Sequence, residues 1–444
     1  MTSFLITHAM TVNEGVSTYQ DVYIRGGRIE AIAGNLSAKP ADRVIDAGGR
    51  TLIPGMIDDQ VHFREPGLTH KGNIASESRA AVAGGITSYM EMPNTNPPTT
   101  STARLAEKYR IAEETSFANY GFYLGGANDN IETIKRLDPK AACGVKVFMG
   151  SSTGNMRVDD PAALEQIFTH SPVIVATHCE DDRIIEENTR RFQIIHGEDI
   201  PIALHPAIRS EEACYRSTAL AVELARQCGT RLHVLHLSTA KELDLFSDGP
   251  MDEKQITAEA CVHHLLFAGT DYGEKGNLIK CNPAIKTEMD REGLLAALAS
   301  GKIDVVGTDH APHTLEEKHQ PYLRSPSGLP LVQHALVSLL EHVHNGVLTL
   351  PQLVEKTAHA PARRFNVKDR GYLREGYWAD LVLVDMDQPT VVDDEKIYYR
   401  CGWTPFAGRT FHASVVATMV SGHLAYIDGK LDPDPKGQRL EFDR

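Results

Sequence analysis

The chain has 444 residues, of which 42% are hydrophobic and 23% are charged, and its formal net charge at pH 7 is −14. This length is more than one small core needs, and it suits a large barrel with a smaller second domain. The negative charge argues against nucleic acid or an anionic membrane surface as a partner. No apolar run approaches the roughly 20 residues of a membrane span.

Cysteine use points to a reducing compartment. The seven cysteines are scattered and show no CxxC spacing, which is typical of free thiols. The N-terminus lacks the basic start and the longer apolar core of a signal peptide. We therefore expect a cytoplasmic protein.

Both ends of the chain predict short strands. Two-residue and four-residue turns with paired glycines separate the first of them. The predicted strands cover residues 22–25, 28–32, 44–46 and 51–53 near the N-terminus, and 379–385, 414–420 and 423–427 near the C-terminus. Because chain ends often lie close together, we expect residues 1–54 and 369–444 to form one β-sandwich domain.

The middle of the chain, residues 55–368, alternates apolar strands with helices. Helices are expected over residues 103–115, 211–227 and 294–299, among others. The eight strand candidates are residues 57–62, 86–92, 120–124, 144–148, 173–178, 232–236, 256–260 and 303–308. This α/β pattern predicts a TIM (β/α)8 barrel. An open doubly wound sheet is the alternative, but no GxGxxG follows the first strand.

Polar side chains stand at the ends of these strands, where TIM barrels carry their chemistry. Gln60 and His62 are two residues apart, so they share one face of the first strand. Further polar residues at strand ends are Asn94, Lys146, His178, His236, Asp309 and His313. A lone histidine in such a place is more often a hydrogen-bonded packing residue than a ligand. Several at one barrel mouth favour a metal site.

Lys146 lies between Val145, Val147 and Phe148 in a predicted central strand. Burial lowers the pKa of a lysine and leaves a neutral, nucleophilic amine. Such an amine reacts with carbon dioxide to give a carbamate, which can bridge two divalent cations. The alternative is an ion pair with a strand-end carboxylate such as Glu259.

Asp309 is the natural general base, because a carboxylate beside a metal can take a proton from a bound water and pass it to a leaving nitrogen. The metal would lower the pKa of that water and polarise a carbonyl. Histidines with a bridging carboxylate suit zinc.

Four motifs together resemble the cyclic amidohydrolases of the amidohydrolase superfamily, and within them the dihydroorotases. They are Val-His-Phe-Arg-Glu-Pro-Gly at 61–67, Met-Pro-Asn-Thr at 92–95, Lys-Cys-Asn-Pro at 280–283 and Asp-His-Ala-Pro-His at 309–313. The resemblance covers essentially the whole chain, including the split β-sandwich. It implies reversible ring closure of N-carbamoyl-L-aspartate to L-dihydroorotate in pyrimidine synthesis, with one or two zinc ions per subunit.

The resemblance also implies roles for single residues. Asp309 corresponds to the catalytic aspartate, and Lys146 to a carboxylated lysine. The implied metal ligands are His62, Lys146, His178, His236 and Asp309, with Gln60 as an additional candidate. The implied substrate contacts are Arg64 and Asn94, which bind the substrate carboxylate, together with Asn282 and His313. A planar guanidinium matches a carboxylate in two hydrogen bonds. A surface salt bridge of Arg64 with Glu65 or a nearby acid is the alternative.

The chain departs from this family at Gln60, where many members have a second histidine. An amide oxygen is a poorer zinc ligand than imidazole, so the metal count depends on this position. Some subgroups use an aspartate after the fourth strand in place of the lysine, and Asp159 and Asp160 lie there. They belong to a Gly- and Ser-rich stretch, residues 151–160, which is a candidate lid.

Two other functions remain open. An allantoinase or hydantoinase would use the same metal centre on rings without the carboxylate. A non-catalytic homologue would serve as a structural partner of aspartate transcarbamoylase, although it would have no reason to retain the ligand set. We expect a homodimer, and we interpret His196, His205 and Arg209 as structural or interfacial.

Overall fold

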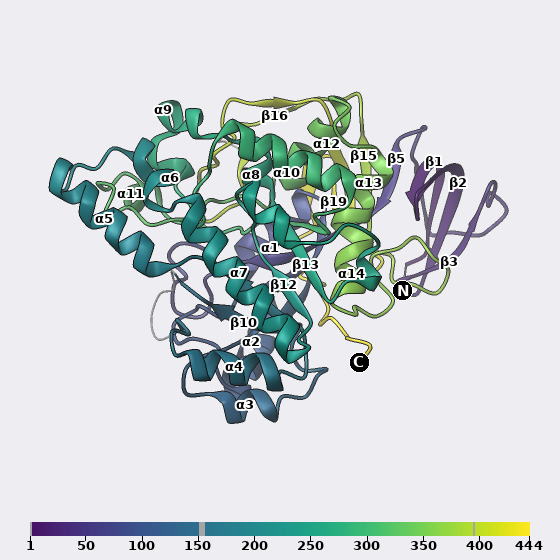
Figure 1. The fold of residues 1–444 in the computed structure, drawn as a ribbon. Helices are drawn as coiled ribbons and strands as arrows, with labels where there is room; N and C mark the ends of the chain where they lie inside the picture. Colours follow the sequence, from purple (N-terminus) through teal and green to yellow (C-terminus); the bar gives the residue numbers. More distant parts are fainter. Residues whose placement is uncertain (1, 151–155, 394–395) are drawn as a thin grey trace.

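The computed structural model describes residues 2–150, 156–393 and 396–444 (Figure 1). A barrel of strands wrapped by helices occupies the centre, and a sheet built from β1, β2 and β3 stands to one side of it, away from helix α5. Residues 151–155 of the candidate lid lie outside the described residues.

Parallel strands form the barrel. One run pairs β6, β7 and β8, and a second pairs β9 through β14 in chain order. Val61 and His310 form a parallel bridge that joins the first strand to the end of the last. The strands are β6 (Met56–Val61), β7 (Ile86–Glu91), β8 (Asn119–Phe122), β9 (Leu124–Gly125), β10 (Val145–Phe148), β11 (Val175–His178), β12 (Leu232–Val234), β13 (Ile256–Cys261) and β14 (Val305–Gly307). The predicted TIM barrel is confirmed.

The third predicted strand differs in one respect from the sequence pattern. Residues 120–124 contribute to two strands, β8 and β9, because Tyr123 interrupts the pairing between them. The Tyr123 hydroxyl donates to the carbonyl of Asp59 at 3.0 Å inside the barrel. This hydrogen bond connects the segment between β8 and β9 to β6.

Helices cover the outside of the barrel (Figure 1). Their bounds are α1 (Ile74–Ala83), α2 (Thr102–Thr115), α3 (Ile131–Lys135), α4 (Pro161–His170), α5 (Asp182–His196), α6 (His205–Ile208), α7 (Glu211–Cys228), α8 (Val262–Leu266), α9 (Tyr272–Lys275), α10 (Glu288–Ser300), α11 (Leu315–Lys318), α12 (Ala335–His344), α13 (Leu350–Val354) and α14 (Ala360–Arg364). Helix α10 begins six residues before the predicted start because Thr287 and Asp290 form a capping box.

One sheet joins the two ends of the chain. Among the described residues its strands are β1 (Phe4–Asn13), β2 (Val16–Arg25), β3 (Arg28–Ala33), β4 (Arg43–Asp46), β5 (Thr51–Pro54), β15 (Leu381–Asp385), β18 (Ser414–Val420), β19 (His423–Ile427) and β20 (Lys430–Leu431). The N-terminal and C-terminal halves meet where β5 pairs antiparallel with β15. The β-sandwich assembled from both termini is confirmed; the boundaries at residues 54 and 369 stay a prediction. A separate pair, β16 (Thr390–Val391) and β17 (Thr410–Phe411), lies above the barrel in Figure 1.

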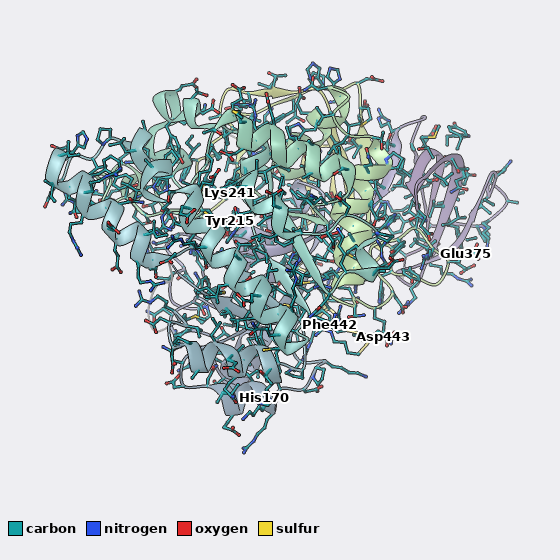
Figure 2. The ribbon with its side chains drawn as sticks, viewed as in Figure 1. His170, Tyr215, Lys241, Glu375, Phe442 and Asp443 are labelled. Carbon is teal, nitrogen blue, oxygen red and sulfur yellow. The ribbon has the colours of Figure 1, made fainter. Side chains whose placement is uncertain are left out.

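The C-terminal tail seals the amino end of the barrel. Phe442, labelled with Asp443 in Figure 2, packs with Ile57, Met90 and Tyr123 in one apolar cluster. This leaves the carboxyl ends of the strands as the open end. Within the described residues, no helix is long and apolar enough to cross a membrane.

Candidate active site

A cavity of about 240 Å³ opens at the carboxyl ends of the barrel strands. Its volume is below the roughly 300–1,000 Å³ of pockets for drug-sized ligands, so it suits a small substrate. The ten side chains predicted as metal ligands, catalytic base or substrate contacts all line it: Gln60, His62, Arg64, Asn94, Lys146, His178, His236, Asn282, Asp309 and His313. The fold therefore brings them together, while their chemical roles stay predictions.

The first and last strands position Asp309. Asp58, on β6, accepts hydrogen bonds from the backbone N–H of Thr308 at 3.0 Å and from its hydroxyl at 2.7 Å. Asp309 follows with a left-handed backbone, φ 51°. This backbone conformation is strained for residues other than glycine, and it is often found at functional sites. Oδ1 of Asp309 lies 3.0 Å from Nε2 of His62 and accepts a hydrogen bond from Nε2 of Gln60 at 3.1 Å.

Asn94 sets the protonation of the His62 ring. Its Oδ1 lies 2.7 Å from Nδ1 of His62, and an amide oxygen can only accept, so Nδ1 carries the proton. Burial lowers the pKa of His62, which keeps the ring neutral and leaves a lone pair on Nε2. That lone pair faces the carboxylate of Asp309, so two acceptor atoms oppose each other at 3.0 Å.

A second close pair is His178 and His236. Nδ1 of His178 lies 3.0 Å from Nε2 of His236, and the backbone of His236 is left-handed with φ 40°. Nε2 of His178 lies 2.9 Å from the carboxylate of Glu180, which also pairs with Arg209. Although burial opposes ionisation, Arg209 and His178 hold the pKa of Glu180 at about 2. The ionised Glu180 accepts the Nε2 proton of His178 and leaves Nδ1 facing the cavity.

Lys146 is buried at 1% exposure on β10. Its ammonium lies 4.6 Å from the centroid of the Phe148 ring and forms no hydrogen bond or ion pair with any described residue. Burial lowers its pKa to about 8. The alternative ion pair with Glu259 is wrong, because Glu259 instead accepts from the backbone N–H of His236 at 2.9 Å and from the Cys261 thiol at 3.2 Å.

Arg64 stands on another wall of the cavity. Its Nε donates to the carbonyl of Pro312 at 3.1 Å, and its Nη2 lies 3.0 Å from Nε2 of His313. The alternative salt bridge with Glu65 is wrong: Glu65 accepts from the backbone N–H of Ile74, and Arg64 forms no ion pair with a described residue. Burial lowers the pKa of Arg64 to about 10, so it remains charged.

Close backbone approaches hold this wall in place. Gly67 has φ 90°, and a Cβ there would lie 1.8 Å from the carbonyl oxygen of Asn96. Only glycine lets the loop that carries Arg64 contact the loop that carries Asn94. Gly328 packs in the same way against Ala311, where a Cβ would lie 2.4 Å from the carbonyl oxygen.

His313 and Asn282 complete the cavity wall. Nδ1 of His313 lies 3.0 Å from the ammonium of Lys71, and its Nε2 lies 3.1 Å from the carbonyl of Ser327. Oδ1 of Asn282 is buried without a hydrogen-bond partner among the described residues. A buried acceptor of this kind is available to a ligand.

The donor set fits a divalent cation. Four electron-pair donors form two pairs, and the atoms of each pair lie 3.0 Å apart. One pair is His62 Nε2 with Asp309 Oδ1, and the other is His178 Nδ1 with His236 Nε2. Asn94 and Glu180 hold the far nitrogens of two of these rings, which is how metal-binding histidines are usually oriented. Neutral imidazoles and carboxylates suit zinc.

Two further groups of metal-ligating side chains are buried elsewhere in the described residues. They are Asp59 with His233 and Glu259, and His263 with His264 and Cys281; in each group the ligand atoms lie within 4.8 Å of one another. The ten cavity residues contribute to neither group. His233 Nε2 lies 3.0 Å from Asp59 and its Nδ1 lies 2.8 Å from the Thr257 hydroxyl, so both nitrogens of this ring are already engaged.

The aspartates after β10 lie away from the cavity. Asp159 accepts from Asn128 at 2.8 Å and pairs with Arg157 at 2.6 Å. Asp160 caps α4 by accepting from the N–H of Ala162 at 2.9 Å. Neither lines the cavity, so the lysine-replacing role considered for them does not fit this geometry.

Sequence reasoning gave no role to Glu180 and did not predict its contact with Arg209. The guanidinium of Arg209 contacts the carboxylate that orients His178, which supports a structural role for Arg209. A signal for Glu180 was present: it stands two residues after His178, the same spacing that links Gln60 to His62. His205 lies 2.7 Å from the carbonyl of Cys281, which supports a structural role.

A barrel with histidines, a buried lysine and an aspartate at its strand ends defines a metal-dependent hydrolase. The chain belongs to the amidohydrolase family, whose model matches residues 51–425, and it is a metal-dependent cyclic amidohydrolase.

Individual relatives cover most of the chain. A dihydroorotase of Halobacterium salinarum is 34% identical over 393 residues, 88% of this chain and 89% of that protein. An allantoinase of Bacillus velezensis is 30% identical over 96% of this chain and 94% of that protein. The structure of an L-hydantoinase (dihydropyrimidinase) from Arthrobacter aurescens superposes with a TM-score of 0.94 at 28% identity and covers 99% of this chain and all of that one.

Proposed function

We propose that this cyclic amidohydrolase is a dihydroorotase that interconverts N-carbamoyl-L-aspartate and L-dihydroorotate. One observation carries the proposal: Arg64 is a buried cation on the cavity wall without a carboxylate partner in the described residues. A buried charge requires a partner of opposite sign, so the substrate is expected to bring a carboxylate. Dihydroorotate carries one, whereas allantoin and hydantoin do not.

The proposed substrate contacts surround Arg64. The guanidinium would hold the carboxylate, and the Nδ2 group of Asn94 would donate beside it, because Oδ1 is already used by His62. Asn282 Oδ1 lacks a partner and would accept an N–H of the ring. Such fixed contacts hold the scissile amide next to Asp309.

Zinc would supply Lewis acidity at the ring amide. The residues that would hold it are His62, Lys146 as its carbamate, His178, His236 and Asp309. Asp309 is the general base in this proposal. As the water oxygen bonds to the amide carbon, Oδ2 of Asp309 takes the proton, and it returns that proton to the ring nitrogen when the C–N bond breaks. In the biosynthetic direction the same oxygen takes the proton from the attacking ureido nitrogen.

Relatives named dihydroorotase support this proposal, while the allantoinase and the L-hydantoinase make those reactions the alternatives. The test is turnover of dihydroorotate, carbamoyl aspartate, allantoin and hydantoin by purified zinc-loaded protein. We expect turnover of the first two. Turnover of allantoin or hydantoin without dihydroorotate would overturn the proposal.

The proposal keeps the cytoplasmic homodimer expected from the sequence. Light scattering after size-exclusion chromatography measures the assembly. A protein without bound metal and without activity after zinc is supplied would instead favour the non-catalytic scaffold.

A further inference from the structure

Gln60 contacts two groups through the two ends of its amide. Its Nε2 donates to Oδ1 of Asp309 at 3.1 Å, and its Oε1 lies 3.8 Å from the thiol of Cys261. The side chain is 1% exposed, on the same face of β6 as His62. It therefore has little freedom to adopt another position.

The carboxylate of Asp309 fixes which way the amide of Gln60 points. With the amide reversed, its oxygen would oppose the carboxylate of Asp309, and two acceptors repel each other. In the observed orientation the carboxylate of Asp309 receives an N–H of the amide, as an acceptor requires. An amide nitrogen has no lone pair to offer a metal ion, so the end of Gln60 that faces the cavity cannot be a ligand.

We propose that Gln60 is a positioning residue that holds Asp309 through a hydrogen bond, and that the centre binds one divalent cation tightly, on the side of His178 and His236. This inference rests on the proposed metal centre, not on the identity of the ring that is hydrolysed.

The two sides of the cavity differ in how many donors they offer. His178 Nδ1 and His236 Nε2 lie 3.0 Å apart with Glu180 fixing the first ring, and Lys146 adds an oxygen once it is a carbamate. On the other side His62 is the one imidazole among the described residues, and Oδ1 of Asp309 already accepts from Gln60. The second position therefore lacks the donor that a histidine at residue 60 would supply.

Metal content of the purified protein tests this without any substrate. After dialysis against metal-free buffer, elemental analysis is expected to give one zinc per wild-type chain and two per chain for Gln60→His. Gln166→His, at an exposed position on α4, controls for zinc held by an added histidine and should stay at one. Two ions retained by the wild type, or one retained by folded Gln60→His, would overturn the proposal.

Single-ligand variants test which side holds the ion, and they do not depend on remodelling residue 60. His178→Asn is expected to lose the zinc, whereas His62→Asn should retain it. Loss of zinc from His62→Asn with retention in His178→Asn would contradict the assignment.

Kinetics separate positioning from a merely structural role. Gln60→Met should keep one zinc and an unchanged KM while kcat falls about 10-fold or more, because a hydrogen bond to a charged group is lost. The assay uses whichever cyclic amide the wild type turns over, so a wrong substrate assignment is distinguishable from a wrong role for Gln60. An unchanged kcat would rule out the positioning role.

Discussion

Glu180 accepts the Nε2 proton of His178 at 2.9 Å, and this contact turns Nδ1 of His178 toward Nε2 of His236. The carboxylate is fully buried and pairs with Arg209. The ring of His178, a proposed metal ligand, is thus oriented by a residue that does not line the cavity.

Glu180→Gln is expected to weaken zinc binding by roughly 10- to 100-fold, because a neutral amide holds the His178 ring less firmly. Competition with a chromophoric chelator measures the affinity. Glu187→Gln, at an exposed position on the following helix α5, is the control and should bind zinc like the wild type. The melting temperature must be compared too, because Arg209 loses a buried partner. Unchanged zinc affinity in folded Glu180→Gln would refute the orienting role.

Arg64→Met should raise KM for dihydroorotate or lower kcat/KM roughly 10- to 150-fold, since about 1.5–3 kcal/mol of charge-assisted hydrogen bonding disappears. Any residual activity toward a ring without a carboxylate should change far less. Arg79→Met, on the outer helix α1, is the matched control. Equal losses of kcat/KM on rings with and without a carboxylate would mean that Arg64 does not bind the substrate carboxylate.

Carboxylation of Lys146 should depend on pH. Burial lowers its pKa to about 8, so the neutral amine that reacts with carbon dioxide increases as pH rises and levels off above that value. We expect the rate of reactivation of metal-stripped protein by zinc and bicarbonate to rise from about pH 6 and to flatten near about pH 9. Lys146→Arg should not reactivate. A rate that keeps rising toward the ordinary lysine pKa would show that the amine is not perturbed.

The sequence allowed the barrel and its cavity residues to be predicted because both follow from local rules. Apolar strands alternate with helices, and strand ends such as those after Lys146 and before Asp309 meet at one edge. The contact of Arg209 with Glu180 follows from no local rule, because it depends on how the residues after α6 pack against the residues after β11. The orientation of the Gln60 amide likewise depends on Asp309, which lies 249 residues further along the chain.

The terminal domain likewise has some features that local rules predict and others that only the packed structure reveals. Strands flanking the glycine turns were predictable, whereas the long first strand β1 (Phe4–Asn13) was not, because its alternation is broken by a bulge between Ile6 and Ala9. Its pairing with β4 and β5 is parallel, and only the packed structure reveals it.

Arg444 offers a test that separates stability from catalysis. Its guanidinium donates to four carbonyls at the amino end of the barrel: Pro139, Ala142, Cys143 and Phe365, at 2.6–3.1 Å. Arg444→Ala removes these charge-assisted bonds and should lower the free energy of unfolding by about 2–3 kcal/mol.

Urea titration followed by circular dichroism measures this loss, and the exposed Arg183→Ala on α5 serves as the control. Because Arg444 lies at the end of the barrel opposite the cavity, kcat and KM at low temperature should match those of the wild type. A fall in kcat without a fall in stability would mean that the sealed end of the barrel is coupled to the active site. It would contradict the assignment of a purely stabilising role to Arg444.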